Sequence, residues 1–235
     1  MPVSPVCNAG CRGCISLQPE GRPPSPQIRL NFVPSVEEIV ELGLLHIANP
    51  EAIFTFGQGC EGEPLMQADT IAKAIKEIRS HTNAGTLHMN SNGSLTDGAR
   101  KVIEQGLDSM RVSMISAREE TYNAYYQPRN YAFANVTETI RIAKANGLWV
   151  SINLLLVPGL NDSRQELEAL IDFVNTNKVD MIQMRNLNFD PDLLFQEVPV
   201  PDEPSLGVPE MMRILRREAP QVRLGSHNPH KETFR

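Results

Sequence analysis

Short apolar runs alternate with longer amphipathic segments along most of the chain. The apolar runs cover residues 52–56, 86–90, 109–114, 149–157 and 180–184. This alternation is typical of βαβ units, in which parallel strands are joined by crossover helices. A short apolar stretch at residues 3–6 adds a first strand, so the pattern predicts six strands.

Helix boundaries are marked by capping signals between these strands. A Ser or Asn followed three residues later by Glu forms a capping box, in which each side chain accepts the other's backbone N–H. The pairs are Ser35 with Glu38, Asn135 with Glu138 and Ser163 with Glu166. Gly85 and Gly147 follow amphipathic runs, as left-handed helix ends require. The predicted helices are residues 36–48, 68–82, 95–105, 136–146, 164–176 and 209–218, with a short one at 117–126.

Repeated β/α units without a break in composition predict one α/β domain over residues 1–235, a partial (β/α)6 TIM-like barrel of parallel strands. The length of 235 residues and the hydrophobic content of 41% are typical of such a globular domain. Residues 187–208 contain several prolines and acidic residues, and we expect them to form an ordered loop over the barrel mouth.

Charge and hydropathy exclude two classes of partner. The chain has 22 basic and 28 acidic residues, a net charge of −6, so no cationic face for general nucleic-acid binding is expected. No apolar run approaches the roughly 20 residues of a membrane span, and the amino terminus shows no signal-peptide pattern. We therefore expect a cytoplasmic protein.

Cysteine spacing is the most informative chemical feature. Cys7, Cys11 and Cys14 follow the first predicted strand with the spacing C-x3-C-x2-C, and Cys60 stands alone. Parallel βα folds bind ligands at the carboxyl ends of their strands. Three thiolates there can hold three irons of a four-iron cluster and leave one iron open, although a zinc site is an alternative. Cys60 is either a small residue filling a turn or a reactive thiol.

This cysteine loop resembles that of the radical S-adenosylmethionine (radical SAM) superfamily. Residues 57–65 also resemble the family's Gly-Gly-Glu-Pro-Leu segment, with Glu61 in place of the first glycine. The resemblance implies a [4Fe-4S] cluster on the three cysteines, and SAM bound through Gly62 and Glu63. A glycine lets the backbone approach the ligand closely, and the cysteines lie on another predicted loop. We therefore expect a side chain at residue 62 to weaken SAM binding and leave the cluster assembled.

Weaker SAM contacts are implied at other strand ends. Asn90, Ser113 and Asn153 each end a predicted strand, and Arg129 lies where relatives place an arginine that binds the SAM carboxylate. The alternatives are polar strand caps and a solvated surface charge. Gly13 departs from the family, which usually has an aromatic residue before the third cysteine.

Two segments are candidates for substrate binding. The four tyrosines lie within residues 122–131, and residues 183–188 alternate polar and apolar side chains. We expect both segments to face one cavity above SAM, because both follow strand ends at the same mouth. Ordinary packing of an inserted helix is the alternative for the tyrosines.

The resemblance implies an enzyme that cleaves SAM reductively to a 5′-deoxyadenosyl radical, which abstracts hydrogen from an unidentified substrate. It also implies a low-potential electron donor of the flavodoxin or ferredoxin type. The alternatives are a non-catalytic iron–sulfur electron-transfer module and a zinc-stabilised binding protein. Only six residues precede Cys7, so we expect a core domain cut from a longer protein.

Overall fold

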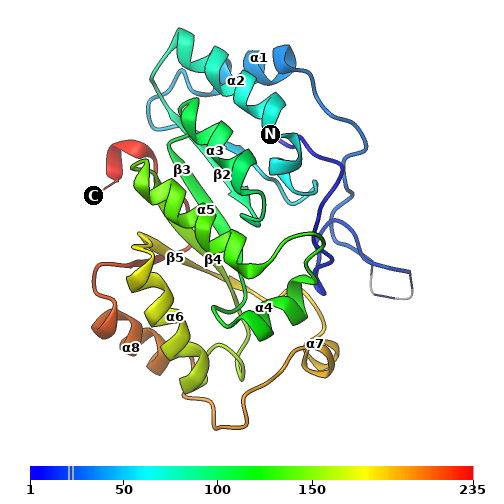
Figure 1. The fold of residues 1–235 in the computed structure, drawn as a ribbon, viewed down its shortest axis with the longest axis vertical. Helices are drawn as coiled ribbons and strands as arrows, with labels where there is room; N and C mark the ends of the chain where they lie inside the picture. The colour runs from blue at the N-terminus through cyan, green and yellow to red at the C-terminus, as the bar shows by residue number, and fades with distance from the viewer. Residues whose placement is uncertain (21, 23, 235) are drawn as a thin grey trace.

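The computed structural model describes residues 1–20, 22 and 24–234, in which six parallel strands form one sheet in the order β1-β2-β3-β4-β5-β6 (Figure 1). The strands are β1 Ile53–Phe56, β2 Thr86–Ser91, β3 Ser109–Met114, β4 Trp149–Leu156, β5 Met181–Asn186 and β6 Arg223–Gly225. The α-helices are α1 Val36–His46, α2 Ala68–His81, α3 Thr96–Glu104, α4 Glu119–Tyr126, α5 Phe133–Ala145, α6 Arg164–Thr176, α7 Pro191–Glu197 and α8 Val208–Glu218. Two 3-10 turns are η1 Pro64–Gln67 and η2 Lys231–Thr233.

The sequential strand order explains why the sheet has two unlike faces. Crossovers between parallel strands are right-handed, so connections that always lead to the next strand place their helices on the same face. Helices α1, α2, α3, α5, α6 and α8 accordingly surround the strands (Figure 1). The sheet does not close, because β1 and β6 are its two edges. The predicted partial barrel is confirmed.

One predicted strand is wrong, and one strand was not predicted. Residues 3–6 form no strand, because the N–H groups of Val3 and Ser4 donate to the buried Glu61 carboxylate, at 2.7 and 3.0 Å. The sixth strand is instead β6, which has only three residues and a single large apolar side chain, Leu224. Such a short strand gives no periodic signal. The other five predicted strands are confirmed within a few residues.

The predicted helices are also confirmed, with shifts at their starts. The capping box of Ser35 with Glu38 is present. The box predicted at Asn135 is wrong, because α5 begins at Phe133 and the Asn135 side chain accepts from the Ala132 N–H at 2.9 Å. The segment 187–208 is not a loop throughout, since α7 occupies part of it. Its Pro191 at the first helical position favours a helix start rather than a loop.

Strand residues alternate between two environments, as a period of two requires. One set packs with the helices in the core and includes Leu87, Met89, Met110, Val112, Val150, Ile152 and Ile182. The polar members of the other set, here called the inner face, are His88, Asn90, Ser109, Arg111, Ser113, Ser151, Asn153, Gln183 and Arg185. Several members of the inner face bind one another, as in the 2.7 Å contact of His88 Nδ1 with Ser109 Oγ. The interior of this barrel is therefore polar.

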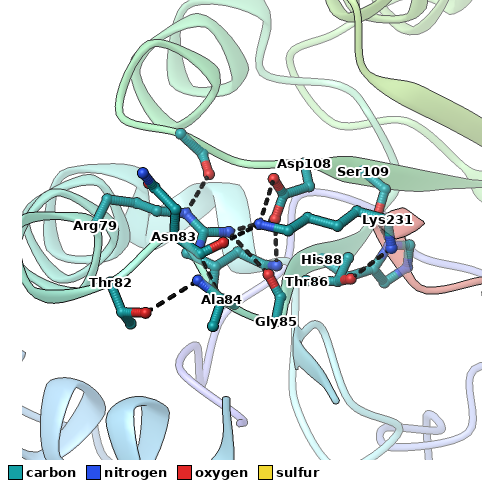
Figure 2. A network of polar contacts seen from close by, with 12 residues as sticks. Arg79, Thr82, Asn83, Ala84, Gly85, Thr86, His88, Asp108, Ser109 and Lys231 are labelled. Carbon is teal, nitrogen blue, oxygen red and sulfur yellow. Dashed lines mark hydrogen bonds and ion pairs between the residues drawn. The ribbon is translucent and has the colours of Figure 1, made fainter. Parts of the chain in front are cut away.

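The amino-terminal ends of the strands, here called the floor, are closed by paired charges. Asp108 precedes β3, accepts the Leu87 N–H at 2.7 Å and pairs with Arg79 of α2. Figure 2 shows that Lys231, from the carboxy-terminal segment, joins this network. Asp180 repeats the arrangement before β5, where it accepts from Lys144 Nζ at 2.5 Å and from a β4 backbone N–H. Each floor carboxylate thus ties a strand to a neighbouring strand and a helix.

Candidate active site

A cavity at the carboxyl ends of the strands brings most of the predicted site residues together. Its lining includes Cys7, Cys11, Cys14, Gly62, Glu63, Asn90, Ser113 and Asn153. Arg129 is not among them, because it lies exposed against the cysteine loop and donates its backbone N–H to Asn8 O at 2.9 Å. Tyr126 of the tyrosine segment also lines the cavity, as do Arg29 and Arg111, which the motifs did not indicate, whereas residues 183–188 are not among the lining residues.

The cysteine loop is held in place by the end of α4. Gly10 N–H donates to Tyr126 O at 2.9 Å, and Arg12 N–H donates to Tyr125 O at 3.0 Å. Glu197 of α7 also forms ion pairs with Arg12 of this loop and with Arg22. In Figure 1, α4 and α7 accordingly lie on the same side as the dark-blue amino-terminal segment. Elements distant in sequence therefore fix the loop.

The tyrosines act largely as packing for this loop. Tyr122 is fully buried and packs against Tyr126 and Phe133, with ring centroids 4.5 and 4.8 Å away. Tyr126 lines the cavity, whereas Tyr131 lines a separate groove of about 680 Å³ beside the first turns of α2, α3 and α5. The alternative of ordinary helix packing thus accounts for much of this cluster.

The surroundings of the sulfurs suit bound thiolates. Cys7 Sγ accepts from the Ala9 N–H at 3.4 Å, and Cys14 Sγ accepts from Arg29 Nη2 at 3.5 Å. Burial raises the pKa of Cys7 to about 11, and burial also raises the pKa of Cys11. Metal binding removes the proton from a thiol, and N–H donors then stabilise the negative sulfur. Arg29 carried no motif signal, because only the folded chain places it beside Cys14.

The donor set fits an iron–sulfur cluster better than a single zinc ion. Within residues 1–20, 22 and 24–234, no group of three or more His, Cys, Asp or Glu side chains is close enough to hold one metal ion. A four-iron cluster instead binds each thiolate at a separate iron, so its ligands stand further apart. Cys7, Cys11 and Cys14 around one cavity would hold three irons of such a cluster and leave the fourth open to a ligand.

The loop after β1 and the cysteine loop form one unit. Gly62 N–H donates to Ser4 O at 2.7 Å, and Glu63 N–H donates to Val6 O at 2.8 Å. Besides binding the amino-terminal segment, the Glu61 carboxylate accepts from the Gln58 N–H at 2.6 Å. Glu61, which replaces the first glycine of the family segment, therefore joins the two loops.

Residue 62 must be a glycine because its backbone lies close to the backbone of Val6. A Cβ atom on residue 62 would lie 2.0 Å from Val6 O and 3.1 Å from Cys7 N. Backbone atoms cannot move aside as a flexible side chain can, so a substitution would displace the residue that leads into the first cysteine. The expectation that a side chain at residue 62 leaves the cluster assembled rested on separate loops, and the structure instead joins them at this residue.

Glu63 is a buried carboxylate at the cavity wall. It accepts from Ser91 Oγ at 2.6 Å, from the Asn92 N–H at 2.8 Å and from the Leu65 N–H at 3.0 Å. Burial outweighs these hydrogen bonds and raises its pKa to about 7. A cationic ligand group would favour the ionised form.

Asn90 and Asn153, two of the predicted SAM contacts, differ in whether their amide groups are already hydrogen-bonded within the protein. Asn90 donates to Gly57 O at 2.7 Å and contacts His88 Nε2 at 3.0 Å, so its amide is largely used. Asn153 Oδ1, by contrast, is buried without a hydrogen-bond partner.

The structure also shows the surroundings of Cys60 and of Gly13, the position that departs from the family pattern. Cys60 is partly exposed, and its carbonyl accepts from the Leu30 N–H at 2.8 Å. A Cβ atom on Gly13 would lie 3.0 Å from Phe189 Cβ. Phe189, which follows β5, therefore occupies the space beside the loop that a side chain on residue 13 would need.

A parallel sheet with three thiols and a glycine loop at its carboxyl ends defines an α/β protein with a cofactor site. The model of the radical SAM superfamily matches residues 1–174, and the chain belongs to this superfamily. The family's cofactors are a [4Fe-4S] cluster and SAM, and its members need a reductant and a substrate.

The relatives are distant and longer than this chain. The FeMo cofactor biosynthesis protein NifB of Klebsiella pneumoniae is 23% identical over 177 residues, which are 69% of this chain and 38% of NifB. The GTP 3′,8-cyclase of Erythrobacter litoralis (strain HTCC2594) is 27% identical over 180 residues, or 74% of this chain and 49% of the cyclase. The chain thus spans half or less of either protein.

A solved structure supports the same fold. Streptococcus suis SuiB bound to S-adenosylmethionine superimposes with a TM-score of 0.65 at 13% identity, covering 96% of this chain and 49% of SuiB. None of the helices in the described part of the chain has the length and apolar content that a membrane crossing requires.

Proposed function

We propose that this protein is the core domain of a radical SAM enzyme that uses SAM to abstract hydrogen from a substrate. The observation that supports this most directly is the junction of the cysteine loop with Gly62 and Glu63 at one cavity. When bound, the cluster would supply one electron that splits the SAM sulfonium and yields a 5′-deoxyadenosyl radical. The enzyme class follows from the family, and the assignment of individual residues is ours.

In this proposal each group of residues has one task. Cys7, Cys11 and Cys14 hold three irons, and the N–H and guanidinium donors around them stabilise negative sulfur. Glu63 and the backbone at Gly62 orient the amino group of SAM. Ser113 and Asn153 face the adenosyl side of the same cavity. The thiols, none of which is in a disulfide, suit the reducing cytoplasm, and the electron donor is of the flavodoxin or ferredoxin type.

The test is anaerobic reconstitution with iron and sulfide, followed by reduction with dithionite in the presence of SAM. Wild-type protein is expected to bind four irons and to release 5′-deoxyadenosine. Cys7→Ala, Cys11→Ala and Cys14→Ala should each lose the stable cluster and SAM cleavage together. Cys60→Ala is the matched control, because the contact of Cys60 with Leu30 uses only backbone atoms. A triple variant with full iron content and turnover would overturn the proposal, as would a zinc-only protein.

A further inference from the structure

Arg111 is a half-buried cation whose charge is not paired within the part of the chain that the structure describes. It extends from β3 into the inner face and lines the cavity, where its Nη1 donates to Gln183 Oε1 at 3.0 Å. Its Nε is buried and has no hydrogen-bond partner. Among the described residues no carboxylate forms an ion pair with it.

The charges around Arg111 do not compensate it. The two acids of the cavity, Glu61 and Glu63, already accept hydrogen bonds from the backbone. The other cation of the cavity lining is Arg29, and Arg185 of β5, outside that lining, acts on the charge of Arg111 and makes no ion pair with a described residue. Burial, and then the charge of Arg185, lower the pKa of Arg111 to about 10, so it remains charged at neutral pH.

The other neighbours on the inner face are neutral. Burial lowers the pKa of His88 to about 3, and the remaining side chains are hydroxyls and amides. A guanidinium that is largely removed from water and has no counter-ion is unfavourable. A ligand that supplies an anion would therefore pair with the charge of Arg111.

SAM itself carries one carboxylate, and a different arginine lies at the end of the cavity where SAM binds in the proposed function. Arg29 contacts Cys14 Sγ, so its guanidinium stands at the cysteine end of the cavity. Arg111 lies two residues before Ser113 on the same face, about 7 Å further from the strand end. Its partner Gln183 comes from β5, across β4.

We propose that the substrate carries an oxyanion, a carboxylate or a phosphate, and that Arg111 and Arg185 bind it. The inference rests on the proposed function and adds a substrate class to it. The unpartnered Asn153 Oδ1 lines the same cavity and can accept a hydrogen bond from a donor near the oxyanion. A guanidinium group suits this role because its planar N–H groups match the two oxygens of a carboxylate or phosphate.

The first experiment measures binding of simple oxyanions. Cluster-loaded protein with saturating SAM is heated in the presence of inorganic phosphate or, separately, acetate, with sodium chloride at equal ionic strength as reference. A phosphate Kd of roughly 1 mM would raise Tm by about 3 °C at roughly 10 mM phosphate. Arg111→Met and Arg185→Met should abolish this shift. Arg111→Lys, which keeps the charge and guards against a folding defect, should retain part of it.

The matched control is Arg118→Met, which removes a guanidinium that pairs with Glu166 outside the cavity. This variant should keep the full phosphate shift. An unchanged shift in Arg111→Met, or no shift in wild type with either anion, overturns the proposal.

The second experiment separates the substrate from SAM as the source of the oxyanion. Calorimetric titration of SAM into the cluster-loaded variants should show an affinity within about twofold of wild type for Arg111→Met, and about tenfold weaker for Arg29→Met. A tenfold loss in Arg111→Met with wild-type affinity in Arg29→Met would assign Arg111 to the SAM carboxylate and overturn the proposal.

If the protein assembles no cluster, the proposed function fails. Phosphate titration of the cluster-free protein then tests the oxyanion site on its own.

Discussion

Two half-buried guanidinium groups, one from helix α2 and one from strand β3, show how differently the two ends of the sheet are built. Arg79 at the floor is 11% exposed, pairs with Asp108 and donates to Ala84 O at 3.0 Å and to Gly106 O at 3.2 Å. Arg111 on the inner face has one neutral partner and an unpartnered Nε. Contacts within the chain satisfy the guanidinium of Arg79, whereas that of Arg111 is left incomplete. Incomplete polar groups reduce stability, which is a cost that binding sites commonly carry.

The largest effect is expected from a methyl group at the junction of the two loops near the cavity. Gly62→Ala should lower the iron content after reconstitution at least about tenfold, because the new Cβ collides with backbone that leads into Cys7. Iron analysis and the visible absorption of the cluster measure this.

Gly59→Ala is the matched control in the same loop. The nearest atom to its Cβ would be Cδ1 of Ile15, at 2.9 Å, and this flexible side-chain tip can move aside. Equal iron content in the two variants would show that the loops are not coupled through Gly62.

Removal of a carboxylate at the floor should act on stability instead of cofactor binding. Asp108→Ala leaves Arg79 without its ion-pair partner and the Leu87 N–H without its acceptor. We expect a loss of about 3 kcal/mol in the free energy of unfolding, measured with urea on the cluster-free protein. Folded variant protein should still reconstitute its cluster. A loss of iron at unchanged stability would contradict the view that the floor contributes to stability and the carboxyl ends of the strands to cofactor binding.

The smallest effect is a pH dependence at Glu63. Its pKa of about 7 in the ligand-free protein lies above the usual value, and a SAM ammonium group favours the carboxylate. SAM affinity should therefore rise with pH, by about tenfold between pH 6 and 8 if only this group titrates. Calorimetry across this range measures the effect, and Glu63→Gln should remove the part that comes from Glu63. The same slope in Glu63→Gln would assign the dependence to another group.

The periodic parts of the fold could be predicted, because strands β1 to β5 and the helices each carry a local signal. Gly62 and Glu63 were also found from a motif. β6 was not predicted, because it has three residues and is held by pairing with β5. The start of the chain was misassigned as a strand, because its partner is the side chain of Glu61, far away in sequence.

Among the site residues, the arginines were hardest to place. Arg129 follows a loop whose direction is set by tertiary contacts, and it lies outside the cavity. Arg29 lies in a segment without periodicity. The alternation of residues 109–114 does mark Arg111 as facing away from Met110 and Val112, so a period-two analysis of that strand would have found it.

The two-sided strands also bear on how such a protein can diverge. On β3, Met110, Val112 and Met114 belong to the core, while Ser109, Arg111 and Ser113 face inward. Adjacent residues of the strand are therefore under different selective pressures. Substitutions at alternate positions can change which molecule is recognised, while the intervening positions preserve helix packing. A lineage can acquire a new specificity by changing single residues without passing through an unfolded intermediate.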